Sequence, residues 1–163
     1  MSESARRMLF VLLLAVALIQ TGAHVSQSFV NYPAWQFIGR DSFPAYHHAM
    51  TVGAFRFLLV PRLVELGLAI VVLLFPPSAI RRSLLVLAIG LTLSGLISTV
   101  LIQRPIHEQL ETIGNTPELL SRLRGTDWIR HGLQMLRAAL YLWMLWLVVN
   151  PRTDTATRSQ AMQ

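Results

Sequence analysis

Two helical stripes of polar residues are the part of this sequence that could do chemistry. One stripe consists of Gln20, His24, Gln27 and Asn31, and the other consists of Arg130, Gln134, Arg137 and Tyr141. Within each stripe the spacing is three or four positions, so each set occupies one face of a helix. Histidine exchanges protons near neutral pH, and arginine stabilises oxyanions. The stripes predict either a catalytic or ligand-binding cavity, or hydrogen bonds that lock the helices together.

Glu65 is the only acidic residue inside a long apolar stretch of the chain. A lone carboxylate in hydrocarbon takes up a proton unless a cation pairs with it. We expect Arg62 or Arg137 to be that cation, because both fall at about the same depth as Glu65. The alternative is that Glu65 carries protons or binds a metal.

The histidines are the candidate metal ligands: His24, His47, His48, His107 and His131. Neutral imidazole binds Zn, Cu, Fe or haem iron. The chain contains no H-x-x-x-H, E-x-x-H or H-E-x-x-H spacing, so the cofactor stays open between none, a His-ligated metal and haem. His24 and His131 are equally suited to acid–base work.

The predicted site lies at the end of the spans away from the chain termini. Its candidate catalytic residues are His24, His131, Arg130, Arg137 and Glu65. In this scheme the histidines handle protons, the arginines stabilise a developing oxyanion, and the carboxylate sets their charge state. The candidate ligand-binding residues are Gln20, Gln27, Gln134, Tyr141 and Trp128. The most specific form of the hypothesis is one cavity lined by His24, Gln27, His131 and Gln134.

The elements that position these residues are membrane spans. Of 163 residues, 53% are hydrophobic and only 13% are charged, and the mean hydropathy is +0.51. All 14 basic residues are arginine and there is no cysteine, which excludes lysine Schiff bases, thiolate catalysis and disulfides. The net charge of +6 does not indicate nucleic-acid binding, because the arginines are dispersed along the chain.

Four apolar spans are expected. Three of them, 8–29, 82–103 and 128–149, are long enough to cross a bilayer, whereas the strongly apolar part of the second, 63–75, is short and needs the kinked segment that begins near Pro44 to complete the crossing. We expect a loop over 31–44, a kink at Pro61, a tight turn at 76–78, and two short surface helices within 104–127. Gly90, Ser94 and Ser98 recur every four residues, a spacing that permits close helix packing in lipid. The predicted fold is an all-α four-helix transmembrane bundle with interfacial loop helices over 1–150, followed by a disordered polar tail over 151–163.

Orientation is predicted from two arginine pairs that directly abut the spans, Arg6-Arg7 and Arg81-Arg82. Positive charge beside a span favours the cytoplasmic side, so we expect cytoplasmic termini and an integral protein of the cell (inner) membrane. The expected partners are the lipid bilayer, a hydrophobic small molecule, and a second copy or another membrane protein, but no nucleic acid.

The segment Trp128-Ile129-Arg130-His131, followed by Arg137, resembles the opening of the last span in the anthrone-oxygenase-like family of small membrane proteins. The aromatic stretch leading to Tyr46-His47-His48, with Pro61 beyond it, is also similar. The resemblance covers about residues 8–149. It implies a four-span bundle and a hydrophobic aromatic or quinone-like substrate that enters from lipid, because some fungal members are linked to anthrone oxidation. It carries over no catalytic residues.

Two function hypotheses follow. The first is a membrane oxidoreductase or oxygenase-like enzyme that acts on a lipophilic aromatic or quinone-like molecule. The alternative is a non-catalytic accessory subunit, or a binder of haem, pigment, quinone or lipid. Hydrolase and nucleotide-dependent activities are excluded on sequence grounds, because the chain contains no nucleophile elbow, phosphate loop or dinucleotide fingerprint.

Overall fold

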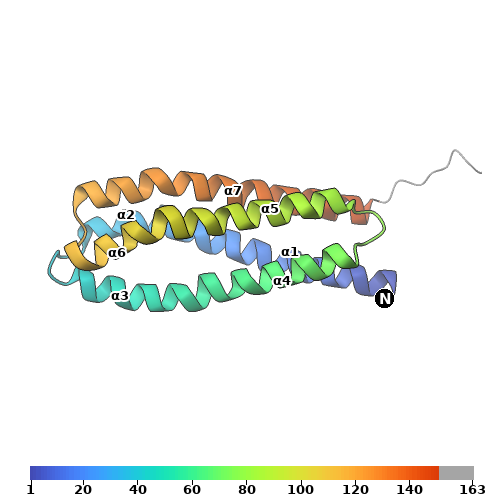
Figure 1. The fold of residues 1–163 in the computed structure, drawn as a ribbon, viewed down its shortest axis with the longest axis horizontal. Coiled ribbons are helices and arrows are strands. Elements are labelled where there is room, and N and C mark those ends of the chain that lie inside the picture. The colour runs from blue at the N-terminus through green and yellow to red at the C-terminus, as the bar shows by residue number, and fades with distance from the viewer. Residues whose placement is uncertain (151–163) are drawn as a thin grey trace, which may run out of the picture.

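The computed structural model describes residues 1–150, which form a bundle of four long helices (Figure 1). No strand occurs among these residues. All four helices are long and apolar enough to cross a membrane. The predicted four-helix bundle and the prediction of an integral membrane protein are therefore confirmed. The predicted tail over 151–163 lies outside the described residues.

Three of the four long helices are composite. The first consists of α1 (Glu3–Ser26), the π-helical turn η1 (Gln27–Asn31), α2 (Tyr32–Ala34) and the 3-10 turn η2 (Trp35–Phe37). The second consists of α3 (Phe43–Ala54), the π-helical turn η3 (Phe55–Leu59) and α4 (Val60–Leu74). The third consists of α5 (Arg82–Ser98), the π-helical turn η4 (Thr99–Gln103) and α6 (Arg104–Ile113), whereas the fourth is α7 (Pro117–Val149) alone.

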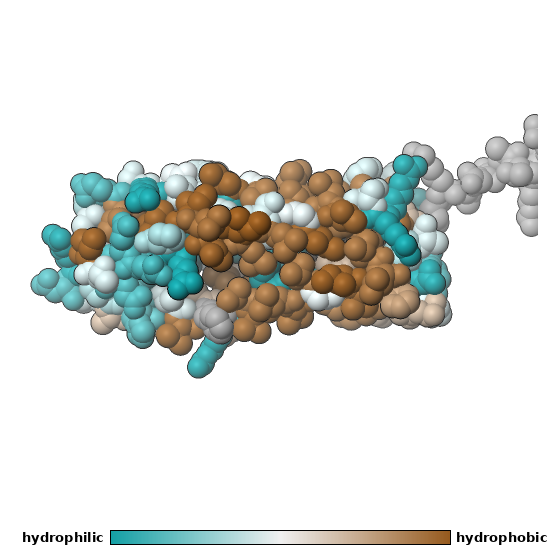
Figure 2. All heavy atoms as spheres, in the orientation of Figure 1, coloured by the Kyte–Doolittle hydropathy of each residue, from teal (hydrophilic) through white to brown (hydrophobic). Residues whose placement is uncertain are grey.

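Helices that follow one another in the chain are neighbours in space. α1 packs against α4 and α7, and α5 packs against the same two helices, so the spans form a closed ring. The start of α1 and the end of α7 lie at one end of the bundle, called here the terminal end, and the opposite end is called the loop end (Figure 1). Figure 2 shows an apolar band across the middle of the bundle, with hydrophilic residues gathered at the loop end and at the tip of the terminal end.

The helices are longer than a bilayer core. At about 1.5 Å per residue each composite helix measures roughly 50 Å, against about 30 Å of hydrocarbon. The arginines that flank the spans at the terminal end lie close to the apolar band. Together with the hydrophilic residues gathered at the loop end, this favours a position in which the excess length projects from the membrane at that end.

Two apolar clusters fill the bundle, one toward each end. The cluster toward the terminal end includes Phe10, Leu13, Tyr141 and Met144, all 0% exposed. The cluster at the loop end is richer in aromatic residues and consists of Tyr32, Trp35, Phe43, Ile106, Leu110, Leu119, Leu120 and Leu123. Buried polar residues occupy the level between the two clusters. The buried residues therefore form an apolar layer, a polar layer and a second apolar layer along the bundle axis.

The structure corrects the predicted connections. The expected loop over 31–44 is helical as far as Phe37, and the segment 104–113 continues the third span instead of forming a separate surface helix. The predicted helix limits in this region are confirmed: Gly114 (φ +92°) follows Ile113, and the Thr116 side chain caps α7 by accepting from the Leu119 N–H. The expected interfacial helices are thus extensions of the spans.

The prolines explain why these helices continue. Each of the three π-helical turns is followed by a proline, Pro33, Pro61 or Pro105, placed four residues after the middle of the turn. Proline offers no N–H to the carbonyl four residues earlier, and its ring clashes with that carbonyl. A wider π-helical turn relieves the clash without ending the helix. The interruption predicted at Pro61 is therefore present, and it recurs at two sites where the sequence analysis expected loops.

The small residues of the third span pack differently from the expectation. Of the three expected to support close packing, Ser98 is buried, whereas Gly90 and Ser94 lie on the exposed face of α5. The close approach to α7 occurs at Gly95, where an added Cβ would lie 3.6 Å from the Gln134 amide nitrogen. That distance is an ordinary van der Waals contact, so Gly95, and not Gly90 or Ser94, is the small residue that faces α7.

Candidate functional site

Arg62, Glu65 and Arg137 form an ion-pair cluster at mid-depth. Arg62 Nη1 donates to Glu65 Oε2 at 2.8 Å, and Arg137 Nη1 lies 3.1 Å from Glu65 Oε1. The three side chains are at most 4% exposed. Glu65 lies about 14 Å from the terminal end of α4, near the middle of a hydrocarbon layer of about 30 Å. The predicted pairing of Glu65 is confirmed, and both arginines take part.

Neutral polar groups surround these charges. Arg62 Nη2 donates to Gln134 Oε1 at 2.8 Å. Arg137 Nη2 donates to Thr21 Oγ1 at 3.1 Å and to the Ala17 carbonyl at 3.2 Å. These residues, here called the midplane cluster, join α1, α4 and α7 at one level. Unsatisfied polar groups in lipid are costly, so the cluster contributes to holding these helices in register.

Gln20 satisfies a backbone group that a proline leaves free. Its Nε2 donates to the Phe57 carbonyl at 3.2 Å. That carbonyl has no α-helical partner, because Pro61 is the residue four positions later and has no N–H. Gln20 therefore connects α1 to the π-helical turn η3 of the second span.

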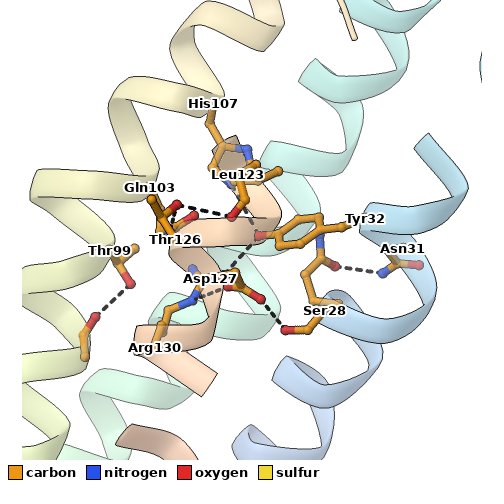
Figure 3. A network of polar contacts seen from close by, with 12 residues as sticks. Ser28, Asn31, Tyr32, Thr99, Gln103, His107, Leu123, Thr126, Asp127 and Arg130 are labelled. Atoms are coloured by element: carbon orange, nitrogen blue, oxygen red, sulfur yellow. Dashed lines mark hydrogen bonds and ion pairs between the residues drawn. The ribbon is translucent and has the colours of Figure 1, made fainter. Parts of the chain in front are cut away.

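A second set of polar residues, the loop-end network, lies about 15 Å further along the bundle. Arg130 Nη2 donates to Asp127 Oδ1 at 2.5 Å and to the Tyr32 hydroxyl at 2.9 Å (Figure 3). The Ser28 hydroxyl donates to the other oxygen of Asp127. Tyr32, Asp127 and Arg130 are buried. This network therefore joins the first span to α7 near the membrane boundary.

Two histidines extend the network beyond Tyr32. The Tyr32 hydroxyl lies 3.4 Å from His107 Nε2, and His107 Nδ1 lies 2.9 Å from His47 Nε2. Arginine only donates, so the Tyr32 oxygen accepts from Arg130 and its own proton is available to His107. On this basis we assign the neutral His107 proton to Nδ1 and the neutral His47 proton to Nδ1. With these assignments, each hydrogen bond in the series Arg130–Tyr32–His107–His47 is donated in the direction of His47.

Aromatic rings enclose the two histidines and connect α3 to α6. Trp35 makes edge contacts with His47 and His107, at centroid distances of 5.4 and 5.9 Å, and Phe43 stacks on His47 at 5.6 Å. Beside them the exposed His48 Nδ1 lies 2.6 Å from Glu111 Oε1. These contacts fix α3 against α6 at the loop end.

A pocket of about 120 Å³ opens between the first span and α7, next to Asp127. It is lined by Ser28, Phe29, Arg124, Asp127, Trp128 and His131. The rings of Phe29, Trp128 and His131 contact one another edge to face at centroid distances of 5.2 to 5.7 Å. Phe29 and Trp128 are more than half exposed. The pocket, here called the lipid-side pocket, therefore faces the surface at the membrane boundary.

The structure distributes the predicted site residues over several places. The midplane level holds Gln20, Glu65, Gln134 and Arg137, the loop-end network holds Arg130, and the lipid-side pocket holds Trp128 and His131. Of the four residues expected to line one cavity, His131 lines the lipid-side pocket, whereas Gln134 accepts from Arg62 and Gln27 accepts from Asn31 at 2.7 Å. His24 and Tyr141 are buried. The catalytic roles remain predictions.

The candidate metal ligands are also divided. His47 meets His107, His48 meets Glu111, and His131 lines the lipid-side pocket. Within residues 1–150 no group of three or more metal-ligating side chains comes together. The donor set therefore offers at most paired imidazoles, and the identity of any cofactor stays open.

Three residues of the loop-end site were missed by sequence reasoning: Ser28, Tyr32 and Asp127. Tyr32 and Asp127 fall in segments that were expected to be loops. A usable signal was present, because Asp127 and Arg130 are spaced by three positions and are neighbours on a helix. This pair could be recognised only by predicting that the last helix begins well before the apolar stretch 128–149, as α7 does at Pro117.

No family model, curated protein or solved structure matches this chain. Membership of the anthrone-oxygenase-like family is therefore a hypothesis that rests on the short motifs quoted above.

Proposed function

We propose that this protein is a membrane oxidoreductase or oxygenase-like enzyme that acts on a lipophilic aromatic or quinone-like molecule at the loop end. The observation that carries the proposal is the lipid-side pocket, which combines aromatic walls with polar groups. Its exposed walls are Phe29 and Trp128, and its polar lining includes Asp127, Ser28 and His131. A molecule dissolved in the bilayer reaches such a pocket without crossing water.

The volume of the pocket limits what it can hold. A dry cavity of about 150 Å³ binds benzene in another protein, so about 120 Å³ accommodates one aromatic ring at most. A fused-ring substrate would insert one ring edge against His131 and leave the remainder in lipid. Edge contacts with Phe29 and Trp128 favour an aromatic ring over an alkyl chain.

The polar groups suit proton removal from such a ring. His131 is placed to take a proton from a phenol or from an acidic CH₂ between two aryl groups. Arg124, which also lines the pocket, is the arginine placed to stabilise a developing oxyanion, whereas Arg130 is paired with Asp127. With dioxygen as oxidant the chemistry balances: the carbanion adds O₂, and loss of one water leaves a carbonyl where the CH₂ was.

The test uses purified protein in nanodiscs with an anthrone as substrate under air, and quinone formation is followed by absorbance. His131→Gln should lower turnover by about 10²–10⁴-fold, the usual contribution of a general base, while ligand binding is retained. His48→Gln is the matched control, because His48 is an exposed imidazole that does not line the pocket.

Two results would contradict the proposal. Binding of anthrone without turnover in the wild type would favour the non-catalytic binder. Equal turnover in His131→Gln and the wild type would remove His131 from the mechanism. An absorption and metal scan of the same sample establishes separately whether haem, pigment or metal accompanies the protein.

A further inference from the structure

The charges of the midplane cluster do not cancel. Arg62 and Arg137 share a single carboxylate, that of Glu65, so one positive charge remains. Arginine does not lose its proton in proteins, and a net charge in hydrocarbon is costly without a counter-charge. Asp127 is the next buried acid in the described part of the chain, and it is already paired with Arg130.

Hydrogen-bond donors without partners accompany the surplus charge. Arg137 Nε and Nη1 are buried and make no hydrogen bond within residues 1–150, although Nη1 lies 3.1 Å from Glu65 Oε1 as an ion pair. The Tyr141 hydroxyl, 0% exposed, is likewise unpartnered there. Tyr141 lies one helical turn from Arg137 on the same face of α7. Two buried acceptors are also without a hydrogen bond at this level, Gln20 Oε1 and Glu65 Oε1, and the latter is the oxygen that pairs with Arg137 Nη1. Neither adds negative charge beyond the one carboxylate already counted.

We infer that the midplane cluster binds a monovalent anion through Arg137 and Tyr141. The single surplus charge sets the charge of the ligand. Arg137 Nε and the Tyr141 hydroxyl, one helical turn apart, are the donors left for it, and they suit a carboxylate, a phenolate or a halide. Phe10 and Met144 lie in the apolar cluster around Tyr141, so a lipophilic acid is as compatible with the surroundings as an inorganic ion. The inference is independent of the loop-end activity, because the two sites lie at different depths.

The test is a charge series in the intact protein. The wild-type cluster carries one surplus positive charge, Arg137→Gln removes it, and Glu65→Gln raises it to two. Each protein is melted in nanodiscs at constant ionic strength, with gluconate as the reference anion and with either chloride or benzoate as the probe. Arg122→Gln is the control, because Arg122 is an exposed arginine of α7.

A saturating anion should raise the wild-type Tm by about 5 °C, following ligand linkage at about 100 times Kd. The rise should be larger in Glu65→Gln, absent in Arg137→Gln and unchanged in Arg122→Gln. Tyr141→Phe should weaken the anion roughly tenfold, as loss of one hydrogen bond does, without changing the charge. Stabilisation by chloride identifies a small inorganic ligand, and stabilisation by benzoate alone identifies a lipophilic acid.

The inference is overturned if neither anion shifts the wild-type Tm, or if Arg137→Gln responds as the wild type does. If Glu65→Gln does not fold, the comparison of Arg137→Gln and Tyr141→Phe with the wild type still decides the matter. Activity at the loop end is not measured in this experiment, so its outcome does not depend on the proposed enzyme function.

Discussion

The midplane cluster and the loop-end network contain the same kinds of charged side chain in different surroundings. In the midplane cluster, two arginines bind one carboxylate at a depth where water is absent. In the loop-end network, Asp127 and Arg130 balance each other, and the remaining members are neutral hydroxyl and imidazole groups that can pass protons. The first region can hold charge and the second can move protons.

The two regions also differ in backbone conformation. The residues of the midplane cluster lie on the α-helical segments α1, α4 and α7. Ser28 lies within the π-helical turn η1 and Tyr32 follows it directly, whereas His107 lies on α6, four residues after the end of η4. π-helical turns are frequent at functional sites, because they redirect side chains without ending the helix. The comparison agrees with the proposal that the chemistry takes place at the loop end.

The largest effect is expected from Glu65→Gln, which removes the shared carboxylate and leaves two buried arginines unpaired. Breaking a buried ion pair costs about 3–5 kcal/mol, and we expect a loss in that range from the free energy of unfolding in SDS titration. Glu111→Gln is the control, because that acid is partly exposed and pairs with an exposed histidine, so its loss should cost under about 1 kcal/mol. Similar losses in the two variants would show that Glu65 is not part of a stabilising cluster.

Asp127→Asn tests the balanced pair and should be milder. The amide keeps a hydrogen bond to Arg130 but removes the charge, and the pair lies near the membrane boundary, where water penetrates. We expect a loss of about 2–3 kcal/mol, at or below the low end for buried pairs. The same titration measures it. A loss exceeding that of Glu65→Gln would reverse the comparison between the two regions.

Tyr32→Phe removes the hydroxyl that connects Arg130 to His107. We expect a loss of about 1–2 kcal/mol, because one buried hydrogen bond disappears and Arg130 keeps Asp127. Tyr46→Phe is the matched control: Tyr46 is 38% exposed, and surface changes usually stay within about 0.5 kcal/mol. Equal effects of the two variants would mean that the Tyr32 hydroxyl makes no stabilising contact.

Apolar run length and polar periodicity were sufficient to predict the bundle, the turn at 76–78, the break at 114–116 and the pairing of Glu65. These features depend on helix periodicity and on depth in the membrane, and both can be calculated from the positions of residues in the sequence. The continuity of the helices could not be read this way, because proline is compatible both with a new helix and with a π-helical turn inside a long one. Tyr32 and Asp127 were missed for that reason: their segments were assigned to loops.

The predicted cavity lined by His24, Gln27, His131 and Gln134 stays a prediction, and the contacts of its residues depend on more than spacing. Gln134 and His24 were expected to be close because they lie at similar depths on inward-facing helix faces. The orientation of a polar side chain, however, depends on the nearest charged donor. Arg62 takes the Gln134 oxygen at 2.8 Å. The lipid-side pocket instead forms where the aromatic rings of Phe29 and Trp128 meet, a contact between two spans that no spacing within one span encodes.

The smallest expected effect tests how the prolines are accommodated. Gln20→Leu leaves the Phe57 carbonyl without its side-chain donor, which should cost about 1 kcal/mol in the wild-type background. In a Pro61→Ala background the new backbone N–H can bind that carbonyl, so the same Gln20→Leu change should cost almost nothing. The double-mutant cycle should therefore give a coupling of about 1 kcal/mol between two positions that are far apart in the chain. Pro105→Ala provides the matched background, because it supplies a backbone N–H to the Leu101 carbonyl in the third span. Gln20 donates to the Phe57 carbonyl and not to Leu101, so there the two changes should simply add. Coupling to Pro105 as strong as that to Pro61 would mean that Gln20 acts through a general loosening of the bundle rather than through the Phe57 carbonyl.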